Sequence, residues 1–349
     1  MTLPPSEQTV GMSRGAIRCA IAAILFGASA PLAAELADDL SPFALAGLLY
    51  VGAALAVLPI AGRARPQHDA VRRGRARLAT AVVLGGALGP VLLAFGLRAA
   101  SPATSSLLLN LELVFTTIIA GFVFREHLGP RVVAGTGAVV AASVVLAGGS
   151  DTDLRWGALL IAGACLCWAI DNCVTAALDE FAPAHITLVK GVVAGSANLA
   201  IGLVADGAPA LGVVAALLVI GAFGYGVSIT LWVAGARELG AARGQLVFAT
   251  APFVGAGVAW TVLGDDVSAR AVIALVVAAA GVLLVVHSDH AHEHSHEAVT
   301  HDHEHEHGDG HHDHAHADGF AGRHAHEHVH VAVTHVHPHL PDVHHRHAH

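Results

Sequence analysis

Long apolar runs are the feature of this sequence that most restricts its fold. Ten runs of about 20 residues occur, which is the length an α-helix needs to cross the hydrocarbon core of a bilayer. Charged residues make up only 13% of the 349 residues, whereas soluble proteins carry about 25%. We therefore expect an all-α integral membrane protein with ten transmembrane helices. The expected spans are 16–34, 42–62, 79–97, 103–124, 131–148, 157–178, 185–205, 210–233, 242–263 and 269–287.

The sequence also contains a weak internal duplication. The segment from Ser101 to His127 aligns with the segment from Ala242 to Asp266 at an offset of 139 residues, and the alignment continues into the next span. Two units of five spans result, and because five is odd, the second unit enters the membrane in the opposite sense. Inverted repeats are common in secondary transporters, whose sites lie near the midplane. The expected domains are a flexible N-terminus (1–13), a first repeat (14–148), a second repeat (155–287) and a C-terminal tail (288–349).

Charges between the spans predict the orientation of the chain. Arginine dominates the loops on the N-terminal side, and Asp and Glu dominate the opposite loops. By the positive-inside rule, we expect a multi-pass protein of the cell (inner) membrane with both termini in the cytoplasm. The N-terminal side carries Arg14, Arg18, Arg63, Arg65, Arg72, Arg73, Arg75, Arg77, Arg125, Arg131, Arg237 and Arg243, and the other side Glu35, Asp38, Asp39, Asp151, Asp153, Asp206, Asp265 and Asp266 with Arg98, Arg155 and Arg270.

One carboxylate lies near the middle of the fourth span. Glu112 follows Asn110 and precedes Thr116 in SSLLLNLELVFTTII. A charged acid at the centre of a spanning helix costs about 2.5–3.5 kcal/mol on insertion scales, so such acids usually face a protein interior or an aqueous path. The functional interpretation places Glu112, Asn110 and Thr116 on a transport pathway. The alternative is that Glu112 is protonated or hydrogen-bonded between helices and only supports packing.

The second half carries its own intramembrane polar residues. Asp171 and Asn172 lie inside the sixth span, one turn after Trp168, and Lys190 lies near the cytoplasmic end of the seventh. Asp171 and Lys190 are candidates for an ion pair between neighbouring antiparallel helices, acting as a gate or a structural clip. Alternatively, Lys190 extends its long side chain to the membrane interface. We include all four residues in the candidate transport pathway.

Two glycine pairs have the GxxxG spacing that allows helices to approach closely. Gly85 and Gly89 lie in GGALG, and Gly191 and Gly195 lie in GVVAG. Such pairs also arise by chance in glycine-rich spans. We interpret them as packing positions.

The intramembrane motifs give the chain a family resemblance. LLLNLELVFTTIIAGFVFREH, TAPFVGAGVAWTVLGDD, WAIDNCVTAAL and ITLVKGVVAG are similar to segments of the drug/metabolite transporter superfamily, specifically its EamA-type members of ten helices in two repeats. The resemblance covers about residues 14–287. It implies alternating-access movement of a small solute, often outward and often driven by an ion gradient, with Glu112 as the protonation or substrate-contact site.

The chain departs from the family pattern at two kinds of position. The pattern keeps a proline after the acid and Gly-Glu at the helix end, whereas this chain has Leu113 and Arg125 in the first repeat. The second repeat retains Pro252 and has Gly264 followed by Asp265. We therefore expect the helix breaks of the two repeats to be asymmetric.

The tail has a different composition from the spans. From His287 to His349 there are 24 histidines in 63 residues, mixed with Asp, Glu and Gly. Low apolar content predicts a disordered cytoplasmic segment. Neutral imidazole is a favoured ligand of Zn²⁺, Ni²⁺, Co²⁺ and Cu²⁺. We therefore expect the tail to bind a divalent transition metal. The alternative is a low-complexity extension, or a general buffer of metal ions and protons. The candidate ligands are His292, His294, His296, His301, His303, His305, His307, His311, His312, His314, His316, His324, His326 and His328.

These observations leave three functional hypotheses. The first is a secondary transporter of a small organic solute with an accessory metal-binding tail, and the family resemblance implies export. The second is a transporter whose cargo is itself a divalent metal such as Ni²⁺, Co²⁺ or Zn²⁺, and the third is a membrane metal sensor without flux.

An enzyme is not expected, because the sequence has no phosphate loop, nucleophile elbow or HExxH pattern. We expect no required cofactor and no nucleic-acid partner; the expected partners are the lipid bilayer, the cargo, protons as a coupling ion and a second copy in a homodimer.

Overall fold

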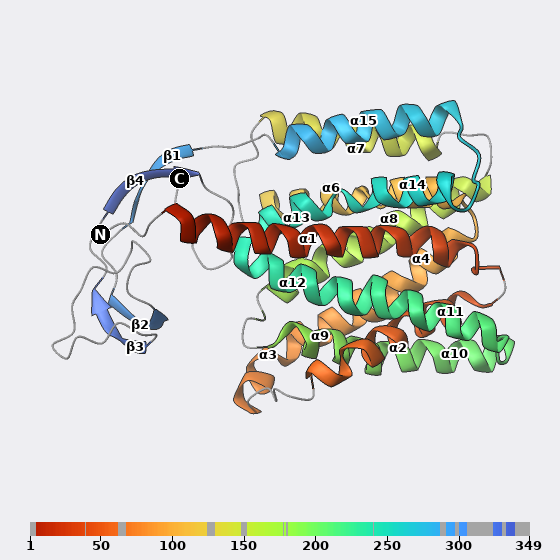
Figure 1. The fold of residues 1–349 in the computed structure, drawn as a ribbon, viewed down its shortest axis with the longest axis horizontal. Helices are drawn as coiled ribbons and strands as arrows, with labels where there is room; N and C mark the ends of the chain where they lie inside the picture. The colour runs from red at the N-terminus through yellow and green to blue at the C-terminus, as the bar shows by residue number, and fades with distance from the viewer. Residues whose placement is uncertain are drawn as a thin grey trace.

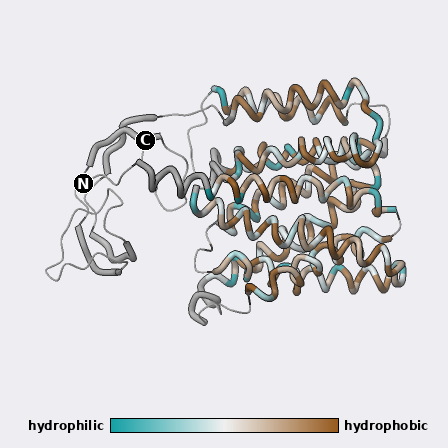
Figure 2. Tube along the Cα trace, in the orientation of Figure 1, coloured by the Kyte–Doolittle hydropathy of each residue, from teal (hydrophilic) through white to brown (hydrophobic). Residues whose placement is uncertain are grey.

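In the computed structural model, the helices of the described residues form ten rods. The rods stand side by side in one bundle (Figure 1). Hydrophobic residues run along the rods, and hydrophilic residues gather toward their ends (Figure 2). In the described part of the chain, seven helical stretches are long and apolar enough to cross a membrane, and two shorter apolar helices accompany them. The predicted all-α membrane fold is confirmed. The structure describes residues 5–38, 40–61, 68–123, 130–147, 152–176, 178, 181–239, 241–286, 291–296, 300–305, 324–329 and 333–338.

Each repeat contributes five of these rods. The rods of the first repeat are α1 (Pro5–Ala34), α2 (Pro42–Ala61), α3 (His68–Thr80) continued by the π-helical η1 (Ala81–Leu88) and α4 (Gly89–Leu97), the broken pair α5 (Pro102–Leu108) and α6 (Leu111–Val123), and α7 (Pro130–Ala147). Those of the second are α8 (Thr152–Ala176), α9 (Pro183–Lys190) with the π-helical η2 (Gly191–Gly195) and α10 (Ser196–Asp206), α11 (Leu211–Gly221) with the π-helical η3 (Ala222–Val227) and α12 (Ser228–Leu239), the broken pair α13 (Ala241–Phe248) and α14 (Ala251–Thr261), and α15 (Ala269–Val286).

Two helices begin 11 residues earlier than the apolar runs predict. α1 starts at Pro5, inside the segment expected to be flexible, and α3 starts at His68, before its span. The apolar run marks what the bilayer covers, whereas backbone hydrogen bonding extends the helix into polar sequence. The span prediction therefore locates the rods but shortens these two.

The two repeats exchange their first helices. α1 packs against α12 and α14 of the second repeat, and α8 packs against α4 and α6 of the first. The last helices, α7 and α15, lie side by side at one edge of the bundle (Figure 1). Equivalent helices thus make equivalent contacts across the molecule, which is the two-repeat architecture predicted from the duplication.

Both repeats break a helix at matching positions, so the expectation of asymmetric breaks is wrong. The first break is at Leu109–Asn110 and the second at Ala249–Thr250, within one residue of the 139-residue offset. In each, a polar side chain binds the carbonyl three residues earlier: Asn110 Nδ2 donates to Leu107 O at 3.0 Å, and Thr250 Oγ1 donates to Val247 O at 2.7 Å. Because the side chain makes the turn, the first repeat needs no proline after the acid.

The glycine pairs lie where helices approach closely, as predicted. A Cβ on Gly85 would overlap the Asp171 carboxylate, and a Cβ on Gly89 would come within 2.9 Å of the Trp168 indole nitrogen. Gly191 and Gly195 face the backbone of α2 at Tyr50. The first pair therefore lets η1 and α4 contact α8 directly.

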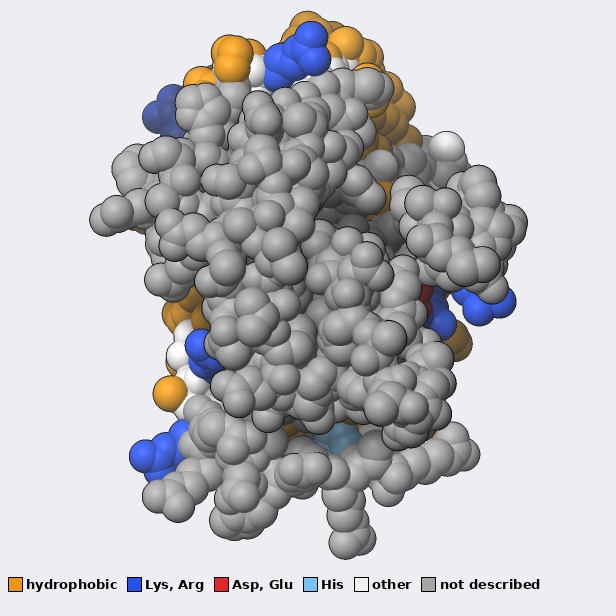
Figure 3. Space-filling view, turned by 90° about the vertical axis from the view of Figure 1, so that its left-hand side faces the viewer, with side chains coloured by type: hydrophobic (Ala, Val, Ile, Leu, Met, Phe, Trp, Pro, Cys, Tyr) orange, Lys and Arg blue, Asp and Glu red, His pale blue; other side chains and the backbone are white. Residues whose placement is uncertain are grey.

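α1 begins and α15 ends at the same end of the bundle (Figure 1), and basic residues lie on the helices that start there. Side chains of Arg and Lys are visible at several points around this face (Figure 3). On the helices that start here, the arginines whose side chains the structure describes are Arg14, Arg18, Arg75, Arg77 and Arg131. The arrangement agrees with the charge pattern from which the orientation was predicted.

The described residues of the tail form four short strands. These are β1 (Ala291–His296), β2 (Thr300–His305), β3 (His324–Val329) and β4 (Val333–Pro338). β1 pairs with β4, and β2 pairs with β3, both antiparallel. Histidine at every second residue has the period of a strand, and Val and Thr favour strands. Two-stranded ribbons are marginally stable at best in water, so these pairs do not amount to a packed domain.

Candidate functional site

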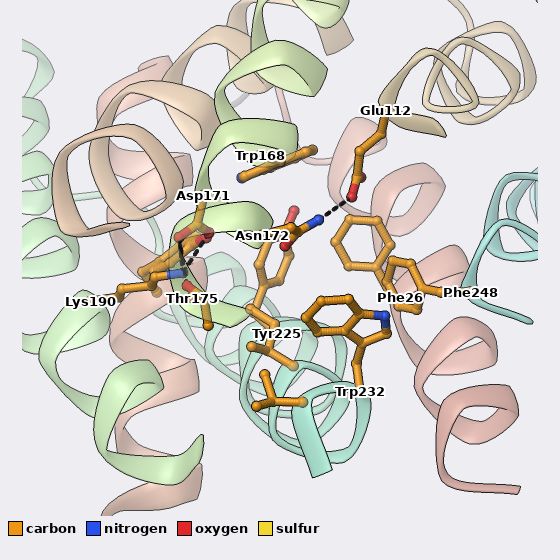
Figure 4. A pocket seen from close by; sticks show the side chains of 13 residues that line it. Phe26, Glu112, Trp168, Asp171, Asn172, Thr175, Lys190, Tyr225, Trp232 and Phe248 are labelled. Carbon is orange, nitrogen blue, oxygen red and sulfur yellow. Dashed lines mark hydrogen bonds and ion pairs between the residues drawn. The ribbon is translucent and has the colours of Figure 1, made fainter. Parts of the chain in front are cut away.

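A pocket lies between the two repeats (Figure 4). The empty space inside the pocket and at its mouth amounts to about 530 Å³, open solvent included. The first repeat supplies α1, α2 and α6 to its wall, and the second supplies α8, α9, η3, α12 and α13. The lining residues are Phe26, Tyr50, Glu112, Trp168, Asp171, Asn172, Thr175, Lys190, Tyr225, Ile229, Trp232, Val233 and Phe248.

Glu112 lies at the start of α6, directly after the helix break. The break places the carboxylate at a helix N-terminus in the interior of the bundle, where the helix dipole favours negative charge. Its side chain is 7% exposed. Asn172 Nδ2 of α8 donates a hydrogen bond to Glu112 Oε1 at 2.7 Å, and Gln245 Nε2 of α13 donates to the same oxygen at 3.4 Å. Both donors belong to the second repeat, so the acid of one repeat is held by amides of the other.

Two of the predicted pathway residues do not line this pocket. Asn110 is buried and forms the helix break through its bond to Leu107 O. Thr116 Oγ1 donates to the backbone carbonyl of Glu112 at 2.8 Å. These two side chains shape the helix that carries Glu112.

A buried ion pair forms the second polar element of the pocket. Lys190 Nζ lies 2.7 Å from Asp171 Oδ1 and 2.5 Å from Oδ2, and both residues are at most 5% exposed. Thr175 Oγ1 donates to Asp171 Oδ1 at 3.1 Å. The ion pair expected between the sixth and seventh spans is therefore present, and Lys190 does not extend to the interface. Figure 4 shows the pair on the opposite side of Asn172 from Glu112.

Aromatic rings fill the wall between these polar groups. The centroid of the Phe26 ring lies 5.9 Å from that of Trp168, 5.6 Å from that of Tyr225 and 5.2 Å from that of Phe248. Tyr50 packs on Tyr225 with centroids 5.4 Å apart. The Tyr50 hydroxyl and the Trp168 indole N–H both donate to the carbonyl of Gly85, at 2.5 and 3.2 Å.

Sequence reasoning missed most of this aromatic wall and the amide donor Gln245. Phenylalanine and tryptophan in an apolar span do not reveal whether they face lipid or the bundle interior. One signal was available: the chain has only two tyrosines, and Tyr50 and Tyr225 both lie inside spans. Both are at most 2% exposed.

The pocket is nearer the end of the bundle at which α1 begins. Asp171, Asn172 and Thr175 occupy the last turns of α8, which ends at that side. Toward the opposite side, α1, α5 and α14 pack closely: a Cβ on Gly27 would overlap the carbonyl of Ala251, and one on Gly255 would come within 2.7 Å of Ser106 Oγ. These three helices are thus in close contact on that side of the pocket.

The sequence matches the family model of EamA-like transporters over residues 13–148 and again over residues 155–287. The chain belongs to the EamA-like transporter family. No curated protein matches it. A solved structure described only as "Crystal structure of protein" is similar to this EamA-like chain, with a TM-score of 0.59 and 18% sequence identity. The match covers 78% of this chain and 98% of the chain in that structure. At that identity the likeness shows the fold alone.

The described part of this EamA-like transporter contains no group of three or more His, Cys, Asp or Glu that could hold a metal ion within the bundle. In the tail, strand pairing sets candidate histidines opposite one another. His301 pairs with His328, His303 with His326 and His305 with His324. His292 and His294 pair with two histidines absent from the predicted ligands, His337 and His335. His296 pairs with Val333, and His307, His311, His312, His314 and His316 lie outside the described residues.

Proposed function

We propose that this chain is a secondary active transporter that carries a small organic solute outward across the cytoplasmic membrane. The observation that carries the proposal is the pocket between the repeats, in which Glu112 of one repeat is bound by amides of the other. Movement of one repeat against the other changes these contacts directly. A site at the interface of inverted repeats is the arrangement that alternating access requires.

The lining supports an organic cargo better than a bare metal ion. Six aromatic residues offer apolar contact area and ring faces that attract cations. Asp171 is neutralised by Lys190, which leaves Glu112 as the pocket carboxylate without a cationic partner among the lining residues. Divalent ions bind with several ligands, six to eight oxygens for Ca²⁺ and about four nitrogen or sulfur ligands for Zn²⁺. A solute with an apolar body and a cationic or hydrogen-bonding head fits this wall.

We place the coupling proton on Glu112. The ionised carboxylate accepts hydrogen bonds from Asn172 and Gln245, whereas a protonated carboxyl group needs an acceptor for its own O–H. Gaining or losing the proton therefore rearranges the contacts between α6, α8 and α13. With both termini in the cytoplasm, as the loop charges predict, the pocket lies toward the cytoplasmic side and is positioned to receive solute there.

Flux in proteoliposomes tests the proposal. Purified full-length protein is reconstituted with an imposed pH gradient and offered labelled amino acids, aromatic amines, Zn²⁺ and Ni²⁺. We expect gradient-driven flux of at least one organic solute above protein-free liposomes. Glu112→Gln should lower that flux at least tenfold.

The matched control is Glu238→Gln on α12, because Glu238 is a partly exposed carboxylate paired with Arg18 away from the pocket. This variant should transport like the wild type. Flux of metal ions only, no flux of any solute, or equal flux in Glu112→Gln and the wild type would each refute the proposal.

A further inference from the structure

The β1–β4 and β2–β3 strand pairs, called ribbons below, follow the same pairing register. In every pair of both ribbons, the residue numbers add up to 629, as in His292 with His337 and His301 with His328. The β2–β3 ribbon pairs Thr300 with Val329 at one end and His305 with His324 at the other. Every second pair of this ribbon consists of two histidines: His301 with His328, His303 with His326 and His305 with His324.

Strand geometry places these histidines together. Residues at i and i+2 of a strand share a face, and directly opposite residues share it too. His301, His303 and His305 therefore lie on one face of the ribbon with their three partners of β3. The other face carries Thr300, Asp302 and Glu304 with Val329, Glu327 and Ala325. One face of the ribbon is thus entirely histidine.

We propose that the histidine face of the β2–β3 ribbon is a binding site for a divalent transition-metal ion, built on the central pair His303 and His326 and completed by a neighbouring pair. Opposite residues of an antiparallel pair have Cβ atoms about 4.5–5.5 Å apart, and neighbouring pairs on one face follow at about 7 Å. Structural zinc sites have four ligands, and two neighbouring pairs supply four histidines. The site does not depend on the transport function proposed above.

The ribbon needs such a ligand to be stable. A two-stranded ribbon is marginal in water on its own. In this one, Asp302 lies directly opposite Glu327, and like charges in that position are destabilising. Metal binding to residues that the unfolded chain does not hold in place contributes its free energy to folding. The ion therefore joins β2 to β3, and the ribbon forms as the metal binds.

The chemistry of the ligands sets the class of ion and the pH range. Neutral imidazole suits Zn²⁺, Ni²⁺, Co²⁺ and Cu²⁺. Because histidine has an ordinary pKa of about 6.5, protonation competes with the metal as the pH falls through about 6. The charged groups placed on the ribbon by its register are Asp302, Glu304 and Glu327, all on the opposite face.

Zinc titration of the purified full-length protein tests the site. Binding is followed by calorimetry, and hydrogen exchange is measured in β2 and β3 with and without Zn²⁺. The double variant His303→Ala/His326→Ala removes the central pair, and the two remaining pairs are too far apart to share an ion. We expect the tightest class of zinc sites to weaken at least tenfold and the zinc-dependent protection of the strands to disappear.

The control is His312→Ala/His314→Ala, which removes the same number of imidazoles from elsewhere in the tail. It should retain both the tight binding and the protection. Equal weakening in the two variants would mean that the tail binds zinc as an undifferentiated set of histidines, and this would overturn the proposal. Strand protection that does not depend on zinc would overturn it as well.

Discussion

At the scale of single residues, the pocket holds its polar groups in two different ways. Asp171 and Lys190 neutralise each other at 2.5–2.7 Å. Glu112, by contrast, is held by neutral amides that can serve either as donors or as acceptors. The ion pair is therefore suited to a fixed structural role, and Glu112 to a change of protonation or partner during transport.

The first prediction concerns the amide of Asn172. Asn172→Leu removes the 2.7 Å donor and leaves Glu112 with the longer bond to Gln245. Hydrogen bonds to charged groups contribute about 1.5–3 kcal/mol, so we expect solute flux to fall about 10- to 100-fold. In a Glu112→Gln background the same substitution should add little. Independent, additive effects of the two substitutions on flux would contradict a direct coupling between them.

The second prediction concerns the stability of the ion pair. Lys190→Met leaves Asp171 as a buried charge without its partner, which should lower the free energy of unfolding by about 3–5 kcal/mol. The double variant Asp171→Asn/Lys190→Met removes both charges and should recover most of that loss. Thermal unfolding of the purified variants in detergent measures both. If the double variant unfolds at the same temperature as Lys190→Met, the pair does not behave as a compensated buried charge.

At the scale of helices, the breaks and the glycine contacts decide where the chemistry is located. Asn110 and Thr250 each turn the chain in the middle of a rod, and the first turn places Glu112 at an interior helix start. Gly85 brings η1 against Asp171. Asp265 Oδ2, at the end of the second repeat's broken rod, accepts the backbone N–H of Ala103 at 2.9 Å and so caps α5 of the first repeat. These contacts connect the two repeats through their helix ends.

The third prediction compares two helical glycines. A Cβ on Gly85 would overlap the carboxylate that binds Lys190, whereas a Cβ on Gly137 of α7 would have nothing within 4 Å. Gly85→Ala should therefore lower the melting temperature and the flux. Gly137→Ala should leave the flux unchanged and stabilise the helix by about 0.5–1 kcal/mol. Similar behaviour of the two variants in thermal unfolding would show that close contact at Gly85 is unimportant.

At the scale of the whole molecule, the sequence predicts architecture better than it predicts the site. Apolar length locates the rods, and the offset between Glu112 and Ala251 reveals the duplication. The Asp171–Lys190 pair was foreseeable because two opposite charges lie in adjacent antiparallel spans. The aromatic wall and Gln245 were not foreseeable, because an apolar run hides which face of a helix meets the interior. The symmetric break was missed because the prediction relied on the absence of proline at Leu113, whereas the side chain of Asn110 makes the turn.

The arrangement of the repeats favours transport through one shared site. Because α1 and α8 each pack into the opposite repeat, neither repeat is a separate body with its own enclosed site. The pocket lies where the repeats meet and is lined by residues of both. A carrier of this kind exchanges solute through one site that faces the two sides in turn, whereas a sensor or a channel does not couple the two directions.

Solute counterflow is the measurement that tests this claim most directly. Proteoliposomes preloaded with unlabelled solute are diluted into a trace of the labelled solute without any pH gradient. A carrier with one alternately exposed site accumulates label transiently above equilibrium. We predict this overshoot for the wild type and for Val204→Trp on the exposed surface of α10, and its loss in Thr175→Trp, which fills the pocket. No overshoot in the wild type, or an unchanged overshoot in Thr175→Trp, would contradict transport through the pocket at Glu112.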